Sequence, residues 1–471
     1  MKMNRKFNIY IMLALVMLGM IIMFANNSII NMLIPTIMRD LKISLGTAQW
    51  LSAGFVLACG ILVPLSAYLV KRFTYKQLFL SSLIVFIIGS FICAFAHSFL
   101  VLLLGRIIQS IGTGISMPLA LNIITSIFPL EKRGSVMGIY GMGVIFAPAV
   151  APSLGGFLIE YYHWSTLFLW MAILEIVILI GAILFFRFKN ETSKPNFDLG
   201  GFILSTLGFG TFIFGVSMND SGISIMGIVL TIVAVFILIA FVKHCLRLKD
   251  KAIVNIFCFK DYNFSYTIII NVIFTVVMYS GMLLMPMYLQ EIRGFSPLNA
   301  ALLLMPGSFC MGILGIFTGR IFDRHGIKIL AIIGSLVMCS VAFMFSQLTM
   351  FTTQLFIMII YLVRSIGVGS VSSPIATAGL ITINREMIPD ANALTNTVKQ
   401  VSGAFGASLS VVIMSIVSTM SLNNHSITSP HLAALHGLNM SFLFMSFLSV
   451  LALVLAIFYK KRTKEKIVLD K

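Results

Sequence analysis

Charged side chains inside long apolar segments are the residues of this sequence best suited to chemistry. Glu175 stands in the segment Trp170-Met-Ala-Ile-Leu-Glu-Ile-Val-Ile-Leu, and it is the carboxylate nearest the middle of such a segment. Ionisable groups in an apolar environment are costly unless they are paired or hydrated, so each is a functional candidate. Burial would favour the neutral carboxyl, and Glu175 could then load and release a proton. The alternatives are a structural acid that pairs with a neighbour, or a side chain that reaches a polar edge.

A second candidate pair is Arg106 and Gln109, which lie three positions apart and therefore share one face of a helix. A buried Arg106 could tune a carboxylate or hold an anion, or it could simply clamp the carbonyl groups of a neighbouring helix. Arg364 stands in a similar context. Lys399 falls in the first turns of its apolar segment, so we expect its side chain to extend to the nearby surface.

A third candidate group follows an apolar segment and contains Asp323, Arg324 and Lys328. An aspartate beside a helix end, with basic partners, can form a charge latch that breaks when that side of the protein opens. The alternative is a solvated loop whose charges only set the orientation of the chain.

A fourth group combines prolines and glycines. Pro148 and Pro152 lie four positions apart on one helix face, and each removes a backbone hydrogen bond. Gly143, Gly155 and Gly156 permit close helix contact. We interpret the group as a hinge and a tight seal, although small residues also pack in this way in any helical bundle.

The composition places these residues in a membrane protein. Of the 471 residues, 59% are hydrophobic and 10% are charged, whereas soluble chains carry roughly 45–50% apolar and about 25% charged residues. The net charge of +17 comes from short basic clusters between apolar segments. This distribution is typical of a membrane topology and argues against nucleic-acid binding.

Fourteen apolar segments are about 20 residues long, the length that crosses a bilayer. The sequence therefore predicts an all-α polytopic membrane protein with 14 transmembrane helices. The predicted spans are 9–33, 46–70, 77–96, 99–127, 135–158, 165–187, 199–217, 223–242, 262–286, 298–320, 327–346, 353–379, 392–415 and 438–459.

The distribution of basic residues supports this number. With both termini inside, the outer segments hold only Arg39, Lys42 and Arg293. Arg106, Arg364 and Lys399 lie within helices, and every other lysine and arginine falls inside. A miscounted helix would invert this pattern. We expect a multi-pass protein of the cell membrane with both termini in the cytoplasm and no soluble domain.

Two local patterns occur twice along the chain. Arg72 and Arg324 stand in similar basic loops, and Arg106 and Arg364 stand in similar helix segments at nearly the same separation. This indicates two pseudo-symmetric six-helix bundles, 1–190 and 261–471, with two inserted helices and a linker in 191–260. Duplicated halves around a midplane site are the architecture of secondary transporters.

The motifs resemble the major facilitator superfamily, in particular the fourteen-helix drug:proton antiporter family that includes lincomycin-resistance and multidrug exporters. The loop 319–328 is similar to the family pattern Gly-x-x-x-Asp-Arg-x-Gly-x-Lys, and 143–156 is similar to an exporter signature. The first-helix segment 26–35 also resembles that branch. The chain departs from the family at Lys71, where Asp is usual, and at Asn26, where many members have Asp.

The resemblance implies a role for Arg106 in proton coupling and assigns Arg72 and the Asp323 loop to gating. Because Lys71 replaces the first-half acid, we expect only one latch to operate fully. We expect Asn26, Arg106, Gln109 and Glu175 to lie at the proton or substrate site.

The sequence thus predicts a bacterial proton-coupled antiporter that exports small hydrophobic, amphipathic or cationic drugs by alternating access, working as a monomer in the lipid bilayer. A same-fold transporter of a metabolite, siderophore or lipid is the alternative. A membrane enzyme or a sensor is disfavoured, because the sequence contains no catalytic constellation, Walker A motif or signalling domain. No cofactor or metal site is expected, since the six cysteines are scattered.

Overall fold

The chain is built from long helices in a computed structural model that describes residues 2–43, 45–129, 132–141, 143, 151, 161–186, 188, 190, 192, 197–218, 224–372, 374–423 and 429–459. No strand occurs in these ranges. The helices are α1 (Lys2–Leu41), α2 (Leu45–Arg72), α3 (Tyr75–Ala94), α4 (Phe99–Ile127), α6 (Trp164–Phe185), α7 (Leu199–Ser217), α8 (Ile225–Leu248), α9 (Tyr262–Met287), α10 (Pro297–His325), α11 (Ile327–Phe345), α12 (Gln354–Val371), α13 (Pro374–Leu380), α14 (Ile388–Asn423) and α15 (Pro430–Phe458). Short helical turns η1 (Lys249–Lys251), η2 (Ile256–Lys260), η3 (Tyr288–Ile292) and η4 (Arg385–Met387) complete the order.

Polar side chains fix where several helices begin. Thr74 and Gln77 form a reciprocal capping box at the start of α3, which satisfies backbone N–H groups that have no partner within the helix. The carboxylate of Asp261 accepts the N–H of Phe264 at the start of α9. At the other end of a helix, Gly326 terminates α10 with a φ of 74°, a conformation that glycine adopts without strain.

The number of membrane-crossing helices agrees with the sequence as far as the described residues allow. Twelve of the described helices are long and apolar enough to cross a membrane, and the count reaches thirteen when the bent α2 is included. The two parts of α2 meet at 53°, next to Pro64, which has no backbone N–H to donate. The predicted fifth span, 135–158, lies largely outside the described residues, so a total of fourteen is compatible with this structure.

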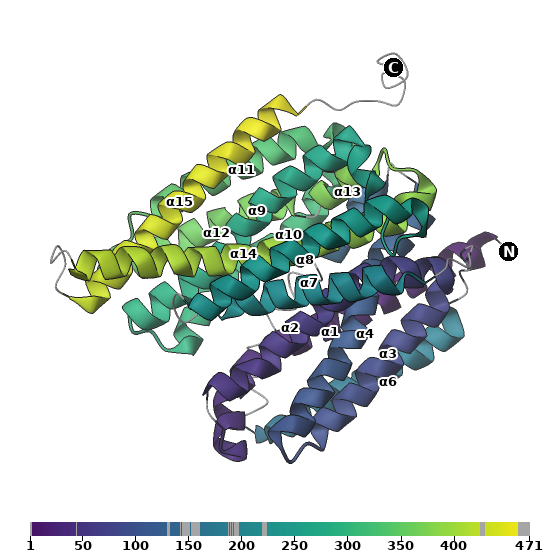
Figure 1. Ribbon diagram of the computed structural model, residues 1–471, viewed down its shortest axis with the longest axis horizontal. Helices are drawn as coiled ribbons and strands as arrows, with labels where there is room; N and C mark the ends of the chain where they lie inside the picture. Colours follow the sequence, from purple (N-terminus) through teal and green to yellow (C-terminus); the bar gives the residue numbers. More distant parts are fainter. Residues whose placement is uncertain are drawn as a thin grey trace.

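The helices form two bundles. In Figure 1 the early helices α1–α4 and α6 pack together in the lower part of the view, and α9–α15 form the upper part. Phe79, Phe86 and Phe186 are fully buried in the core of the first bundle. Phe345 and Phe442 meet with ring centroids 5.1 Å apart in the second. Each half therefore has an apolar core of its own.

The inserted helices α7 and α8 form a hairpin between the two bundles, across the front of the view in Figure 1. On one side, the ring of Phe214 in α7 lies 5.2 Å from Trp50 in α2. On the other, Ser408 in α14 donates a hydrogen bond of 3.1 Å to the carbonyl of Val216. The hairpin thus touches both halves through α7, while most of α8 presents exposed apolar side chains.

Glycines let helices of the first bundle approach closely. A Cβ at Gly89 in α3 would lie 2.6 Å from the backbone nitrogen of Gln109 and 2.7 Å from the carbonyl oxygen of Gly105, both in α4. No side chain fits there without separating the two helices, which carry the buried residues Ser90, Arg106 and Gln109.

We expect Gly89→Ala to destabilise the protein by about 1–3 kcal/mol, because overpacking a tight interface forces backbone shifts. Gly210→Ala is the matched control, since its Cβ would lie 3.6 Å from Ile61, an ordinary contact. Thermal unfolding of the purified protein in detergent should show a lower midpoint for Gly89→Ala alone. Equal midpoints would contradict the tight α3–α4 contact.

Candidate functional site

The two halves meet where α2 and α10 end and α14 begins. This end carries Lys71, Arg72, Arg133 and Arg324 and is called the basic end. Its contacts join residues that are far apart in the sequence, so they hold one half against the other.

The first contact is made by Asp323 at the end of α10. Its carboxylate accepts the N–H groups of Gly134 at 2.8 Å and Ser135 at 2.9 Å, and the Ser135 hydroxyl at 2.7 Å. These N–H groups begin the helical segment 132–141 of the first half, where unpaired N–H groups attract an anion. The expected partners Arg324 and Lys328 are instead exposed. Asp323 therefore caps a helix of the other half rather than pairing with its own loop.

The second contact is an ion pair between Lys71 of α2 and Asp390 of α14, with 2.5 Å between Nζ and the carboxylate oxygen. The Asp390 side chain is 1% exposed, and its other oxygen accepts the N–H of Asn255 at 3.0 Å. Arg72, which the sequence assigned to gating, is exposed. The basic residue that bridges the halves is thus its neighbour Lys71.

These two contacts change how the first-half loop is interpreted. The lysine that stands in place of the usual acid does not leave the loop without a partner, because the acid comes from α14. Sequence reasoning missed Asp390. The sequence did contain a signal for this residue, because Asp390 is the one acidic residue in α14.

Two further contacts seal the same region. The side-chain amide of Asn392 in α14 donates to the side-chain oxygen of Asn122 in α4 at 2.8 Å. Gly138 of the first half lies directly against the carbonyl of Gly315 in α10. These contacts bring α14 against α4 and α10 against the segment 132–141. The halves are therefore closed at the basic end.

A buried polar cluster joins three of the predicted site residues in the first half. The side-chain oxygen of Gln109 accepts hydrogen bonds of 3.0 Å from both Asn26 in α1 and Arg106 in α4. The amide of Gln109 donates to Ser90 in α3 at 2.8 Å. Arg106 and Gln109 have no exposed surface, and Asn26 is 3% exposed.

Arg106 also makes contacts beyond that cluster. Its Nε donates to the carbonyl of Leu51 in α2 at 3.2 Å, and its guanidinium lies 4.3 Å from the centre of the Phe55 ring. The cluster therefore links α1, α2, α3 and α4. Both interpretations from the sequence, a coupling residue and a clamp on a neighbouring carbonyl, are compatible with this geometry.

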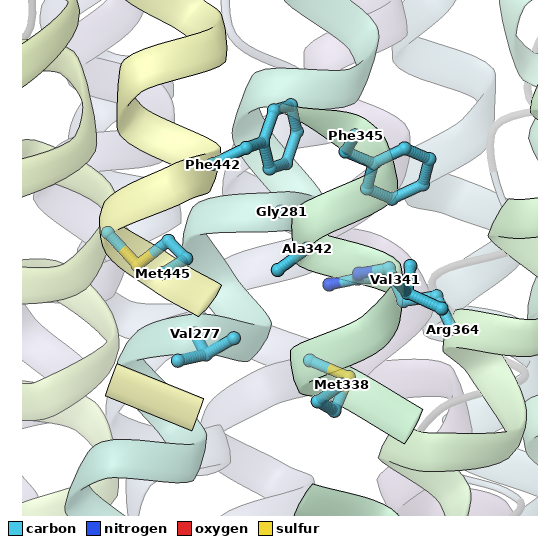
Figure 2. Close-up of a pocket in the computed structure, with 9 residues that line it drawn as sticks. All are labelled: Val277, Gly281, Met338, Val341, Ala342, Phe345, Arg364, Phe442 and Met445. Atoms are coloured by element: carbon cyan, nitrogen blue, oxygen red, sulfur yellow. The ribbon is translucent and has the colours of Figure 1, made fainter. Parts of the chain in front are cut away.

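Arg364 in the second half resembles Arg106 in that it also donates to a backbone carbonyl of a neighbouring helix. Its guanidinium donates to the carbonyl of Met278 in α9 at 2.6 Å and packs over Gly281. Figure 2 shows Arg364 beside a small apolar cavity between Met338, Ala342 and Phe442. Arg364 has no counterpart of Gln109 beside it, and its guanidinium instead lies 5.3 Å from the centre of the Tyr361 ring.

Glu175 lies apart from this cluster. It is fully buried in α6, and neither carboxylate oxygen has a hydrogen-bond partner among the described residues. One oxygen lies 3.5 Å from the Cβ position of Gly19 in α1, beside Phe79 and Leu83 of α3. Glu175 therefore neither pairs with a base in the described structure nor extends to an edge.

Most of the proline and glycine group lies outside the described residues. This holds for Pro148, Pro152, Gly155 and Gly156. Gly143 is buried, and a Cβ there would lie 2.8 Å from Ile21 in α1. The hinge stays a prediction.

A third carboxylate fixes the hairpin at the basic end. Asp198 caps α7 through the N–H of Gly201, and it also accepts from His244 of α8 at 2.8 Å and from the N–H of Ile253 at 3.1 Å. Burial raises the pKa of Asp198, but these hydrogen bonds outweigh it and leave the pKa lowered. The linker from Ile253 to Asn255 thus joins the hairpin to Asp390.

Comparison with known proteins places this architecture in a family. The model of the Major Facilitator Superfamily matches residues 16–407. The lincomycin resistance protein LmrB of Bacillus subtilis (strain 168) is 37% identical over 461 residues, which cover 96% of this chain and 95% of the relative. The riboflavin transporter RibZ of Clostridioides difficile (strain 630) is 25% identical over 470 residues, covering 97% and 99%.

A solved structure shows the same fold. The proton:xylose symporter XylE matches with a TM-score of 0.65 and 15% identity, over 95% of each chain. At this identity the match concerns the fold alone.

We expect Lys71→Met to open the basic end, because it leaves the buried Asp390 carboxylate without its cation. Loss of a hydrogen bond to a charged group costs about 1.5–3 kcal/mol. To detect opening, Gln400→Cys is added to each variant, and its labelling by a membrane-impermeant maleimide is measured in inside-out vesicles. Arg72→Met is the control, since it removes the same charge from the adjacent exposed position. Equal labelling of the two variants would rule out the bridge.

We expect Gln109→Leu to lower the thermal midpoint more than Ser90→Ala does. The first change removes the acceptor of both Asn26 and Arg106, while the second removes one acceptor of Gln109. An unsatisfied buried donor costs about 1–3 kcal/mol. Unfolding in detergent provides the measurement, and a larger loss in Ser90→Ala would show that Gln109 is not the centre of the cluster.

Proposed function

The chain belongs to the major facilitator superfamily, and on that premise we propose that it is a proton-coupled exporter of hydrophobic or amphipathic compounds. The two halves rock about a site between them, and inward proton movement drives compounds outward. The observation that carries the coupling is Glu175, a buried carboxyl without a partner in the described structure.

The exchange of conformations takes place at the basic end. In the cell membrane this end faces the cytoplasm, as the positions of the basic residues indicate. The bonds of Asp323 and Asp390 close it, and both carboxylates lie where water can replace their partners when the halves separate. The present structure is therefore closed toward the cytoplasm.

Glu175 is the proton site in this proposal. An ionised carboxylate without a partner in apolar surroundings is costly, so the group is neutral in this conformation. Its neighbours come from α1, α3 and α6, and a change in their packing that admits water would let the proton leave. Protonation is thereby coupled to the arrangement of the first half.

The Arg106 cluster supports this exchange without binding the proton itself. Arg106 and Gln109 hold α1 and α2 in place through Asn26 and Leu51. A rigid first half transmits a change at Glu175 to the interface between the halves. Asn26 contributes an amide here, so Glu175 supplies the acid that the first helix lacks.

The test uses inside-out vesicles with an imposed pH gradient and a panel of labelled compounds that includes lincomycin and riboflavin, which the names of the relatives suggest. We expect uptake that stops when the gradient is collapsed. Glu175→Gln should abolish gradient-driven uptake and retain exchange of compound across the membrane, because only the titratable proton is lost.

Asp198→Asn is a useful control, since it changes a different buried carboxylate without touching Glu175. Uptake that continues after the gradient is collapsed would exclude proton coupling. Full gradient-driven uptake in Glu175→Gln would remove Glu175 from the mechanism while leaving transport itself intact.

A further inference from the structure

Lys399 lies deep in the molecule, too far from the basic end for its side chain to reach the surface there. Asp390, which marks that end on α14, precedes it by nine positions, or about 13 Å of helix. The expectation that Lys399 extends to the surface assumed a helix that starts at residue 392, whereas α14 starts at Ile388. Lys399 is therefore the twelfth residue of α14 and lies about 16 Å along the helix from its start.

Lys399 faces the first half. It follows Asn392 by seven positions, which is nearly two helical turns, so the two share a face of α14. Asn392 contacts Asn122 of the first half, and the amide of Gln400 approaches the sulfur of Met117 in α4 at 3.9 Å. Lys399 stands between these two contacts along α14 and is partly exposed, which places it at the interface of the two halves.

No acidic side chain pairs with the Lys399 ammonium in the described part of the chain. Lys399 makes no ion pair or hydrogen bond there, and the neighbouring helices α2, α4, α7, α9 and α15 contain no Asp or Glu. Glu175 lies on α6, against α1 and α3.

Apolar and aromatic groups complete the surroundings. One turn beyond Lys399, Gly403 packs on the ring of Tyr279 in α9, with a Cβ position 3.1 Å from ring carbons. Met117 contributes a polarizable side chain that adapts to varied ligands. The region thus combines a positive charge that has no counter-ion in the described structure with apolar side chains that could contact the hydrophobic part of a ligand.

We propose that Lys399 recognises the charge of the transported compound and selects amphipathic molecules that carry an anionic group, such as a carboxylate, sulfonate or phosphate. The proposal rests on the proposed exporter function and names its substrate class. Charges interact more strongly in a low-dielectric interior than in water, so the ammonium gains a counter-ion when an anion binds and repels a cation. This differs from the cationic substrates expected from the sequence.

The test compares fluorescein, an anionic dye, with rhodamine 123, a cationic dye built on the same ring system. Binding to the purified protein is measured by fluorescence anisotropy, which requires no transport. We expect fluorescein to bind more tightly than rhodamine 123, and Lys399→Met to weaken fluorescein binding at least tenfold, or about 1.4 kcal/mol. Lys399→Arg should retain binding, and Lys399→Glu should reverse the preference.

Lys243→Met is the matched control, because it removes a lysine from an exposed position on α8. Tighter binding of rhodamine 123 by the unaltered protein, or an unchanged dye ratio in Lys399→Met, would overturn the proposal. Elution as a single monodisperse species on size exclusion shows that each variant is folded. Gradient-driven uptake in vesicles tests the exporter function separately from the role of Lys399. If uptake is absent but the purified protein still prefers the anionic dye, the exporter function is excluded and the role of Lys399 in binding is retained.

Discussion

Two carboxylates of the second half, Asp323 and Asp390, hold the first half at one end of the molecule. Each accepts a backbone N–H group from outside its own bundle, and Asp390 also binds Lys71. A buried carboxylate that loses such partners without replacement pays a large desolvation cost. The position of these groups at the polar end makes replacement by water feasible there, so this contact can be broken and remade while the deeper structure stays intact.

The polar groups at membrane depth behave differently. Gln109 accepts from two donors and gives to a third residue, and the glycine contacts of α3 and α4 leave no room between the helices. Water is scarce at this depth, so these bonds have no substitute. These bonds hold α1, α2, α3 and α4 together around Gln109 and Arg106. Glu175 in the first half and Lys399 in the second are, by contrast, charged residue types for which the described structure shows no partner.

The sequence predicted the helices well because the bilayer requires apolar segments of a set length. It also predicted that Arg106 and Gln109 share a face, since helical spacing is local. It could not predict the Lys71–Asp390 pair, which joins residues 319 positions apart, or the capping of Gly134 by Asp323. Those contacts depend on how the bundles meet. The start of the helix that carries Lys399 was also misplaced, because α14 begins at Ile388, four residues before the apolar pattern indicates.

The hairpin of α7 and α8 has a consequence for compounds dissolved in lipid. α7 packs on α2 through Trp50 and on α14 through Ser408, and α8 covers it with an apolar outer surface. The seam between α2 and α14 is therefore shielded from the hydrocarbon on that side. A molecule that partitions into the bilayer is therefore kept from entering between the bundles at this hairpin.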